Sequence, residues 1–288
     1  MNTARPGTPP RVLPTGAPRG LLVLAGIAVV LLVLPLVGLL QRMPWTGLAD
    51  LLGGRAVGEA IRLSLVVSLS ATALCVVLGI PLAWVLARVS FPGRRLVRSF
   101  VLLPMVLPPV VGGTALLFAL GRRGLVGQWL DRWFGVTLPF TTTGAVLAAT
   151  FVALPFFVIT VESAISQLDR RYEDTASSLG SSPWTTFGKV TLPMVRQAIV
   201  AGAALSWARA LGEFGATITF AGDAPGRTRT LPLSIFVALE TEPERALALS
   251  LVLVMVSLSV LVALRGVPIT PPEVEPCLLY TSPSPRDL

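Results

Sequence analysis

The sequence contains no histidine, few charged residues and only two cysteines, and each scarcity excludes a class of protein. Without histidine the chain has no imidazole for acid–base catalysis or metal ligation. The two cysteines, Cys75 and Cys277, have neither the spacing of a metal site nor the number needed for a disulfide framework. We therefore expect no catalytic site, no metal site and no cofactor.

Charge is scarce as well, since 13% of the 288 residues are charged and 53% are hydrophobic. A soluble domain usually carries about 25% charged residues, so this composition indicates a membrane protein. The net charge of +8 would by itself suggest a nucleic-acid partner. The basic residues, however, stand in short gaps between apolar runs and form no basic face beside aromatic residues. We therefore expect no nucleic-acid partner.

Six apolar runs are each near or above the roughly 20 residues that a helix needs to cross about 30 Å of hydrocarbon. One run is interrupted only by Arg209 and Glu213. Backbone polar groups in lipid must be paired internally, so we predict an all-α membrane protein with six transmembrane helices. Prolines within the runs predict kinks. The runs are residues 21–40, 63–87, 99–121, 133–161, 197–222 and 246–264.

The two ends of the chain differ in composition from this transmembrane domain, which we place at residues 21–266. Residues 1–20 are rich in Pro, Gly and Arg and predict a disordered cytoplasmic tail, and residues 267–288 predict a second tail. The final stretch, 277–288, resembles translated read-through of sequencing adapters, so we interpret it as non-native; an ordinary tail is the alternative. A signal peptide is the rival interpretation of the first apolar run, but that run is longer than such segments usually are.

Lysine and arginine are more frequent in the connections on the side of the N-terminal tail, with a cluster between Arg88 and Arg98. This bias predicts that both termini and the long connection 166–196 are cytoplasmic. On the other side, the apolar stretch 230–239 is too short to cross, so we expect an interfacial or re-entrant segment.

The connection 166–196 has the pattern of two short helices joined at a glycine. Asp169 can cap the first helix, and Gly180 can end it in a left-handed conformation. Pro183 favours the start of the second helix, which carries apolar residues at Trp184 and Phe187. A hairpin with an apolar face outside the membrane needs a protein partner.

This connection resembles the EAA loop of ABC importer permeases, with every spacing of that motif intact. Asp replaces the usual Glu, Thr the first Ala, and Val the Ile. The resemblance implies a coupling hairpin that docks on a separate ATPase subunit, and the sequence itself lacks the phosphate loop of an ATPase. An ordinary amphipathic loop is the alternative. The implied coupling residues are Asp174, Ala176, Gly180, Val190, Leu192 and Pro193.

Residues 207–240 resemble molybdate permeases, with sulfate permeases as close relatives. The matching pieces are 209–217, 221–222, 225–228 and 230–233, and Asp223 stands where molybdate permeases usually have Asn. The resemblance implies the fold of a type I ABC importer permease in the bacterial inner membrane, carrying an oxyanion. Molybdate is the expected substrate; sulfate, thiosulfate and tungstate are the alternatives.

The same resemblance implies the partners of the chain. Two permease chains, expected to be identical, would pair with two ATPase subunits, and an external binding protein would deliver the oxyanion. The surrounding membrane lipid is the remaining partner. A secondary transporter is the rival from another class, and it would predict inverted repeats and broken helices with buried carboxylates. No inverted repeat is evident, and Glu213 is the only clearly mid-span acid.

Arg209 and Glu213 are four residues apart, so they share one face of a helix. A charge within the membrane is costly unless it is paired or wet. The two side chains either form a structural ion pair or line the pathway of the substrate, where Arg209 would lower the barrier for a dianion. Gly212 and Gly215 would allow close helix approach, which completes the set of candidate pathway residues.

Overall fold

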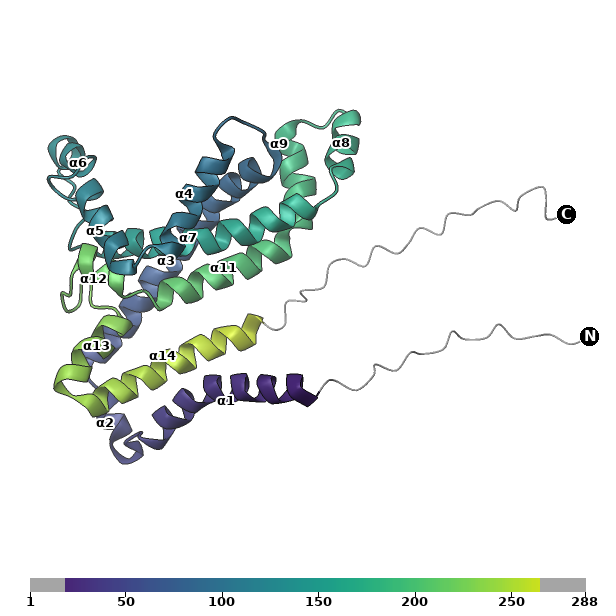
Figure 1. Ribbon diagram of the computed structural model, residues 1–288. Helices are drawn as coiled ribbons and strands as arrows, with labels where there is room; N and C mark the ends of the chain where they lie inside the picture. Colours follow the sequence, from purple (N-terminus) through teal and green to yellow (C-terminus); the bar gives the residue numbers. More distant parts are fainter. Residues whose placement is uncertain (1–18, 265–288) are drawn as a thin grey trace, which may run out of the picture.

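The computed structural model describes residues 19–264, and within that range all regular structure is helical (Figure 1). The predicted tails lie outside the described residues, except that Arg19 and Gly20 already belong to the first helix. The long helices are α1 (Arg19–Gln41), α3 (Arg55–Arg88), α4 (Arg94–Val106), α5 (Pro109–Leu120), α7 (Thr142–Gln167), α11 (Arg196–Leu211) and α14 (Pro243–Leu264). The shorter ones are α2 (Leu48–Leu52), α6 (Gly127–Phe134), α8 (Arg171–Ser178), α9 (Pro183–Thr186), α10 (Leu192–Met194), α12 (Gly215–Ala221) and α13 (Leu231–Thr241).

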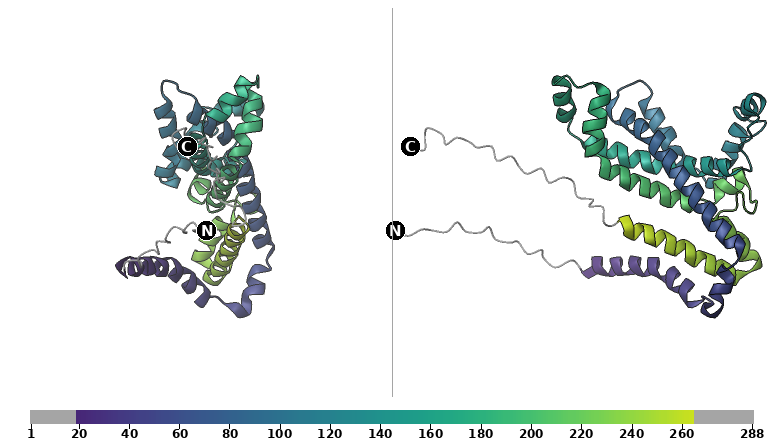
Figure 2. Two further views of the ribbon diagram at one scale, coloured as in Figure 1. Left: turned by 90° about the vertical axis from the view of Figure 1, so that its right-hand side faces the viewer. Right: turned by 180° about the vertical axis from the view of Figure 1, so that it is seen from behind.

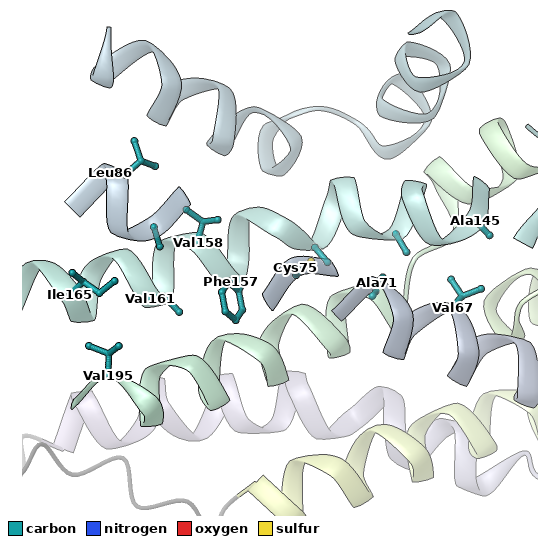
Figure 3. Close-up of a cluster of buried hydrophobic side chains, with 14 of the residues drawn as sticks. Val67, Ala71, Cys75, Leu86, Ala145, Phe157, Val158, Val161, Ile165 and Val195 are labelled. Carbon is teal, nitrogen blue, oxygen red and sulfur yellow. The ribbon is translucent and has the colours of Figure 1, made fainter. Parts of the chain in front are cut away.

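Helices α3, α7 and α11 pack side by side and form the centre of the bundle (Figures 1 and 2). Their contact surfaces are rich in fully buried alanines and valines, with Phe157 of α7 among them (Figure 3). Phe157 lies against Gly79 of α3, where an added Cβ would collide with the ring. Small residues thus let these backbones approach closely, as is common between helices in membranes.

Helices α8 and α9 lie at one end of the bundle, which we call the hairpin end (Figure 1). Helix α1 begins and α14 ends on that side of the molecule, whereas α2, α6 and α13 lie at the opposite end. Three places stand out in this layout: the hairpin, and the two positions at which a long apolar run is interrupted.

The predicted six continuous crossings are only partly confirmed. Four described helices, α1, α3, α7 and α14, are long and apolar enough to cross a membrane, and α4 with α5 makes a fifth if the pair counts as one span. That pair is bent by 120°. The bend lies at Pro108 and Pro109, which have no backbone N–H to donate to the preceding turn. The predicted span 197–222 is likewise divided into α11 and α12, so the count of six is not confirmed.

The predicted run 133–161 starts too early. The structure forms a loop after α6, and α7 begins only at Thr142, with the Thr141 hydroxyl accepting a hydrogen bond from the N–H of Gly144 (3.0 Å). Residue Gly135 ends α6 in a left-handed conformation (φ 64°). Hydropathy does not register such helix ends, so the predicted run includes the apolar loop between α6 and α7. The short apolar stretch 230–239 does form a separate element, α13, which packs against α14.

Candidate functional site

The hairpin is built around Gly180, which follows α8. Gly180 has φ +83°, so its predicted left-handed conformation is confirmed. The N–H of Ser181 donates to the carbonyl of Ala176 (3.0 Å), and the N–H of Gly180 donates to that of Ser177 (2.9 Å). This double hydrogen bond is the usual way in which a glycine ends a helix. Pro183 begins α9, as predicted.

Glu173 holds the hairpin against the rest of the protein. One carboxylate oxygen lies 2.9 Å from Nε of Arg88 at the end of α3, and the other accepts a hydrogen bond from the Thr191 hydroxyl (2.8 Å). Arg88 also donates to the backbone carbonyl of Leu168 (3.1 Å). Both charged side chains are largely buried, with 7% of Arg88 and 18% of Glu173 exposed. The hairpin is therefore fixed to α3 within a single chain.

Some apolar side chains of the hairpin pack against the bundle, and others are exposed. Phe187 packs edge-on against Trp84 of α3, with ring centroids 5.9 Å apart. Leu179 and Trp184 are instead each 83% exposed, on either side of Gly180. The predicted apolar face thus has an inner part that packs against the bundle and an outer part that nothing in the described residues covers.

The remaining predicted coupling residues lie around this turn. Asp174 and Pro193 are exposed, whereas Ala176, Val190 and Leu192 are partly buried.

The sequence pattern pointed to Asp174 and missed its neighbour Glu173, which makes the contacts with Arg88 and Thr191. The partner, Arg88, is far away in the sequence, so no local pattern pointed to it. The carboxylate of Asp169 accepts from the N–H of Arg171 (3.0 Å), near the predicted cap.

The second candidate site lies where α11 ends and α12 begins. Nη1 of Arg209 is 2.6 Å from one carboxylate oxygen of Glu213, so the predicted ion pair is present. The other oxygen accepts a hydrogen bond from the N–H of Ala216 (2.8 Å), in the first turn of α12. The Glu213 side chain is only 1% exposed, while Arg209 is 28% exposed. Glu213 therefore bridges the interruption of this span, a role that its spacing alone did not predict.

The two interrupted spans meet at their interruptions. A Cβ added to Gly215 would lie 2.7 Å from Cβ of Pro109, the first residue of α5. A Cβ added to Gly113 would lie 2.7 Å from the carbonyl oxygen of Ala216. The close helix approach expected at Gly215 is therefore present. At Gly212 it is absent: this residue is exposed at the end of α11, and an added Cβ would meet only Ala208 of its own helix, at 3.6 Å.

Two further ion pairs were not predicted from the sequence. Glu162 of α7 is buried and pairs with Arg98 of α4, which joins these helices near the hairpin end. In the loop after α12, Arg229 donates two hydrogen bonds to Asp223, of 2.6 and 2.8 Å. Opposite charges separated by a helix or a loop have no fixed spacing, so the sequence gives no signal for such pairs.

Within residues 19–264, no three acidic or cysteine side chains gather in an arrangement that could hold a metal ion. What this geometry offers is instead a fixed surface for a partner, at the hairpin, and a charged pair beside two interrupted helices within the apolar bundle. Discontinuous helices with a buried carboxylate are also typical of the substrate sites of secondary transporters, so this geometry indicates transport and does not separate the two classes.

Comparison with known proteins defines the class. The sequence matches the family described as the binding-protein-dependent transport system inner membrane component over residues 76–265, and the chain belongs to this family. It is 45% identical over 223 residues to the molybdenum transport system permease protein ModB of Mycobacterium tuberculosis, covering 77% of this chain and 84% of the relative. The Escherichia coli ModB protein is 45% identical over 178 residues, covering 62% and 78%.

A more distant relative is the sulfate transport system permease protein CysT of Escherichia coli, at 37% identity, covering 72% of this chain and 75% of that protein. Among solved structures, a bacterial ABC transporter that imports the polysaccharide alginate has a chain with a TM-score of 0.69 and 18% identity, covering 86% of this chain and 95% of that chain. At that identity the likeness shows the fold alone, which is that of an ABC importer permease.

Proposed function

We propose that the chain is the permease subunit of an ATP-driven importer of molybdate. The choice of molybdate as the substrate rests on the 45% identity with molybdenum permeases over most of their length, against 37% with a sulfate permease. Sulfate, thiosulfate and tungstate are the alternatives, since all are tetrahedral dianions.

The substrate pathway passes the junction of the two interrupted spans. Arg209 is the cation there, partly exposed and held by the buried Glu213. A positive charge at this depth lowers the barrier for a dianion, and the interrupted backbone supplies polar groups that a continuous helix would not. Gly215 keeps α5 and α12 in contact beside it.

The hairpin receives the ATPase. Leu179 and Trp184 form the exposed apolar tip, which would be buried in a cleft of the ATPase subunit, while Glu173 transmits its movement to α3. Two ATPase subunits and two copies of this chain make the transporter, and an external protein delivers the anion. A bacterial alginate transporter with a similar fold was solved in complex with its periplasmic binding protein, which supports that arrangement.

The hairpin end is the cytoplasmic end, so that both termini are cytoplasmic. The arginine cluster between Arg88 and Arg98 and the shared position of the start of α1, the end of α14 and the hairpin support this orientation (Figure 1). We place the transmembrane domain at residues 21–266, of which 265 and 266 lie outside the described residues.

Uptake by proteoliposomes containing the permease, its ATPase and its binding protein tests the proposal. We expect ATP-dependent accumulation of labelled molybdate that an excess of unlabelled sulfate does not suppress. Accumulation of sulfate in preference to molybdate would support the sulfate alternative. Accumulation driven by an ion gradient, without the ATPase, would contradict an ABC importer altogether. Proteoliposomes with a hydrolysis-deficient ATPase are the control.

A further inference from the structure

Helix α6, Gly127–Phe134, is a short amphipathic helix at the end of the bundle opposite the hairpin (Figure 1). At 100° per residue, Trp129, Leu130, Trp133 and Phe134 fall on one side of the helix and the polar residues on the other. Trp133 is 69% exposed and Phe134 71%. Trp129 is 44% exposed and Leu130 is partly buried, so the three aromatic residues form most of the exposed part of this face.

The direction of α6 is fixed by its attachment to α5. The N–H of Leu125 donates to the carbonyl of Phe118 (3.1 Å), and that of Val126 donates to Ala119 (2.8 Å). Gly127 lies against the backbone end of α5, with no space for a side chain. The helix therefore does not swing on a free linker, and its exposed aromatic face has a defined position.

Arginines outnumber acidic residues on α6 and in the loop before it. The guanidinium of Arg132 lies 5.4 Å from the centre of the Trp129 ring, which is a cation–π distance. Arg122 pairs with Asp131 at 3.3 Å, and Arg123 is exposed. Three arginines and one aspartate leave this segment positively charged.

We propose that α6 lies in the headgroup region of the bilayer and binds anionic phospholipid. Trp and Phe would enter the boundary of the acyl chains, where tryptophan is enriched, and Arg123 and Arg132 would contact phosphate groups. The exposed surface is continuous with α5, because Phe118, 75% exposed, is bonded through its backbone to Leu125, 76% exposed. Lipid that covers the exposed side of α5 at Phe118 would therefore extend onto α6.

This position has a consequence for the substrate pathway. Helix α6 is fixed to α5, and α5 is packed without a gap against α12 through Gly113 and Gly215. A helix held in the interface would thus fix the outer side of the junction of the two interrupted spans. The inference does not depend on which anion the transporter carries.

Quenching of tryptophan fluorescence by brominated lipid tests the proposal on the full-length protein in bilayers. The chain has six tryptophans, so the emission of Trp129 and Trp133 is obtained as the difference between the wild type and the variant Trp129→Phe with Trp133→Phe. The bilayer is phosphatidylcholine with a minor share of phosphatidylglycerol brominated near its headgroup. We expect quenching to remove a larger fraction of this difference emission than the fraction of the lipid that is brominated. Combining Arg123→Gln with Arg132→Gln should reduce the loss to that share.

Two tryptophans serve as matched controls. The emission removed by Trp45→Phe reports an exposed residue after α1, at the same end, and that removed by Trp207→Phe reports a residue only 6% exposed. We expect Trp207 not to respond, and Trp45 to respond no more strongly to brominated phosphatidylglycerol than to brominated phosphatidylcholine.

Three results would overturn the proposal. If the difference emission of Trp129 and Trp133 is quenched by aqueous iodide and not by brominated lipid, α6 lies in water. If neither quencher reaches it, a protein covers α6, such as a second copy of this chain or the binding protein. If both lipids quench equally at equal share, α6 has no preference for anionic phospholipid.

Discussion

The carboxylate of Glu173 and the guanidinium of Arg88 form an ion pair, with 2.9 Å between the nearest oxygen and Nε, that joins the hairpin to the end of α3. The pair is made within one chain, so the hairpin is positioned before any ATPase binds. Anchoring and docking therefore fall to different residues: Glu173 faces the bundle, whereas Leu179 and Trp184 face outward. This separation allows the two roles to be tested independently.

Replacing Glu173→Gln should loosen the hairpin in the isolated permease. The change removes the charge that pairs with Arg88 in a largely buried position, and the expected loss of stability is roughly 1–3 kcal/mol. We expect a lower unfolding temperature of the permease in detergent and faster cleavage of the hairpin by trypsin. Asp174→Asn is the matched control, because Asp174 is exposed and should leave both measurements unchanged. An unchanged cleavage rate in the Glu173→Gln protein would contradict the anchoring role.

Replacing Gly180→Glu should abolish transport without affecting insertion into the membrane. The left-handed φ of +83° costs a residue with a side chain about 1 kcal/mol or more. The added group would also stand on the open surface of the turn, which the proposed function assigns to the ATPase. The measurements are uptake, the amount of permease in the membrane and co-purification of the ATPase.

Two further variants separate backbone strain from steric hindrance at Gly180. No atom of the chain would contact an added Cβ there, so a small side chain meets no obstacle within the permease. Gly180→Asn tolerates the left-handed conformation and should retain more ATPase than Gly180→Glu. Ser181→Ala should behave as the wild type. Full recruitment and uptake by Gly180→Glu would show that this turn does not couple to an ATPase.

Replacing Arg209→Ala should leave Glu213 buried without its cation, which usually costs about 3–5 kcal/mol unless the carboxyl becomes protonated. Glu213 also accepts a hydrogen bond from the N–H of Ala216. A second substitution at Glu213 should therefore restore folding best if the new side chain is uncharged and still accepts that hydrogen bond. We expect Arg209→Ala with Glu213→Gln to fold better than Arg209→Ala with Glu213→Ala, as judged by thermal unfolding.

Transport by the better-folded double variant then decides the role of Arg209. Low molybdate uptake at normal abundance would mean that the cation serves the anion, and wild-type uptake would mean that the pair only braces the bundle. Wild-type stability and uptake in the single variant Arg209→Ala would contradict both interpretations.

Replacing Gly215→Ala should destabilise the contact between α5 and α12. The added methyl group would lie 2.7 Å from Cβ of Pro109, and overpacking of this kind typically costs about 1–3 kcal/mol. Gly212→Ala is the matched control, since its nearest contact would be 3.6 Å away. We expect a lower unfolding temperature and reduced uptake only for Gly215→Ala, and equal behaviour of the two variants would contradict the close contact.

Local patterns in the sequence carried much of the fold and part of the site. The turn at Gly180 and the pair of Arg209 and Glu213 depend on residues near one another in the chain, so spacing was enough to predict them. The ion pair of Glu173 with Arg88 and the contact of Gly215 with Pro109 join residues brought together only by packing. The prolines of the run 99–121 predicted its kink, which the structure places at Pro108 and Pro109. The division of the run 197–222 was missed, because hydropathy counts apolar residues and does not register where a helix is interrupted.

The two interrupted spans have a mechanical consequence. Among the described residues, no backbone hydrogen bond joins α4 to α5 or α11 to α12. A change of angle at either junction would therefore break no peptide hydrogen bond. At the second junction, the side chain of Glu213 links the two helices, because it pairs with Arg209 of α11 and accepts a hydrogen bond from the N–H of Ala216 of α12. The angle at this junction is thus held by one carboxylate together with the packing of α12 on α5, so both the charge of Glu213 and the absence of a side chain at Gly215 bear on it.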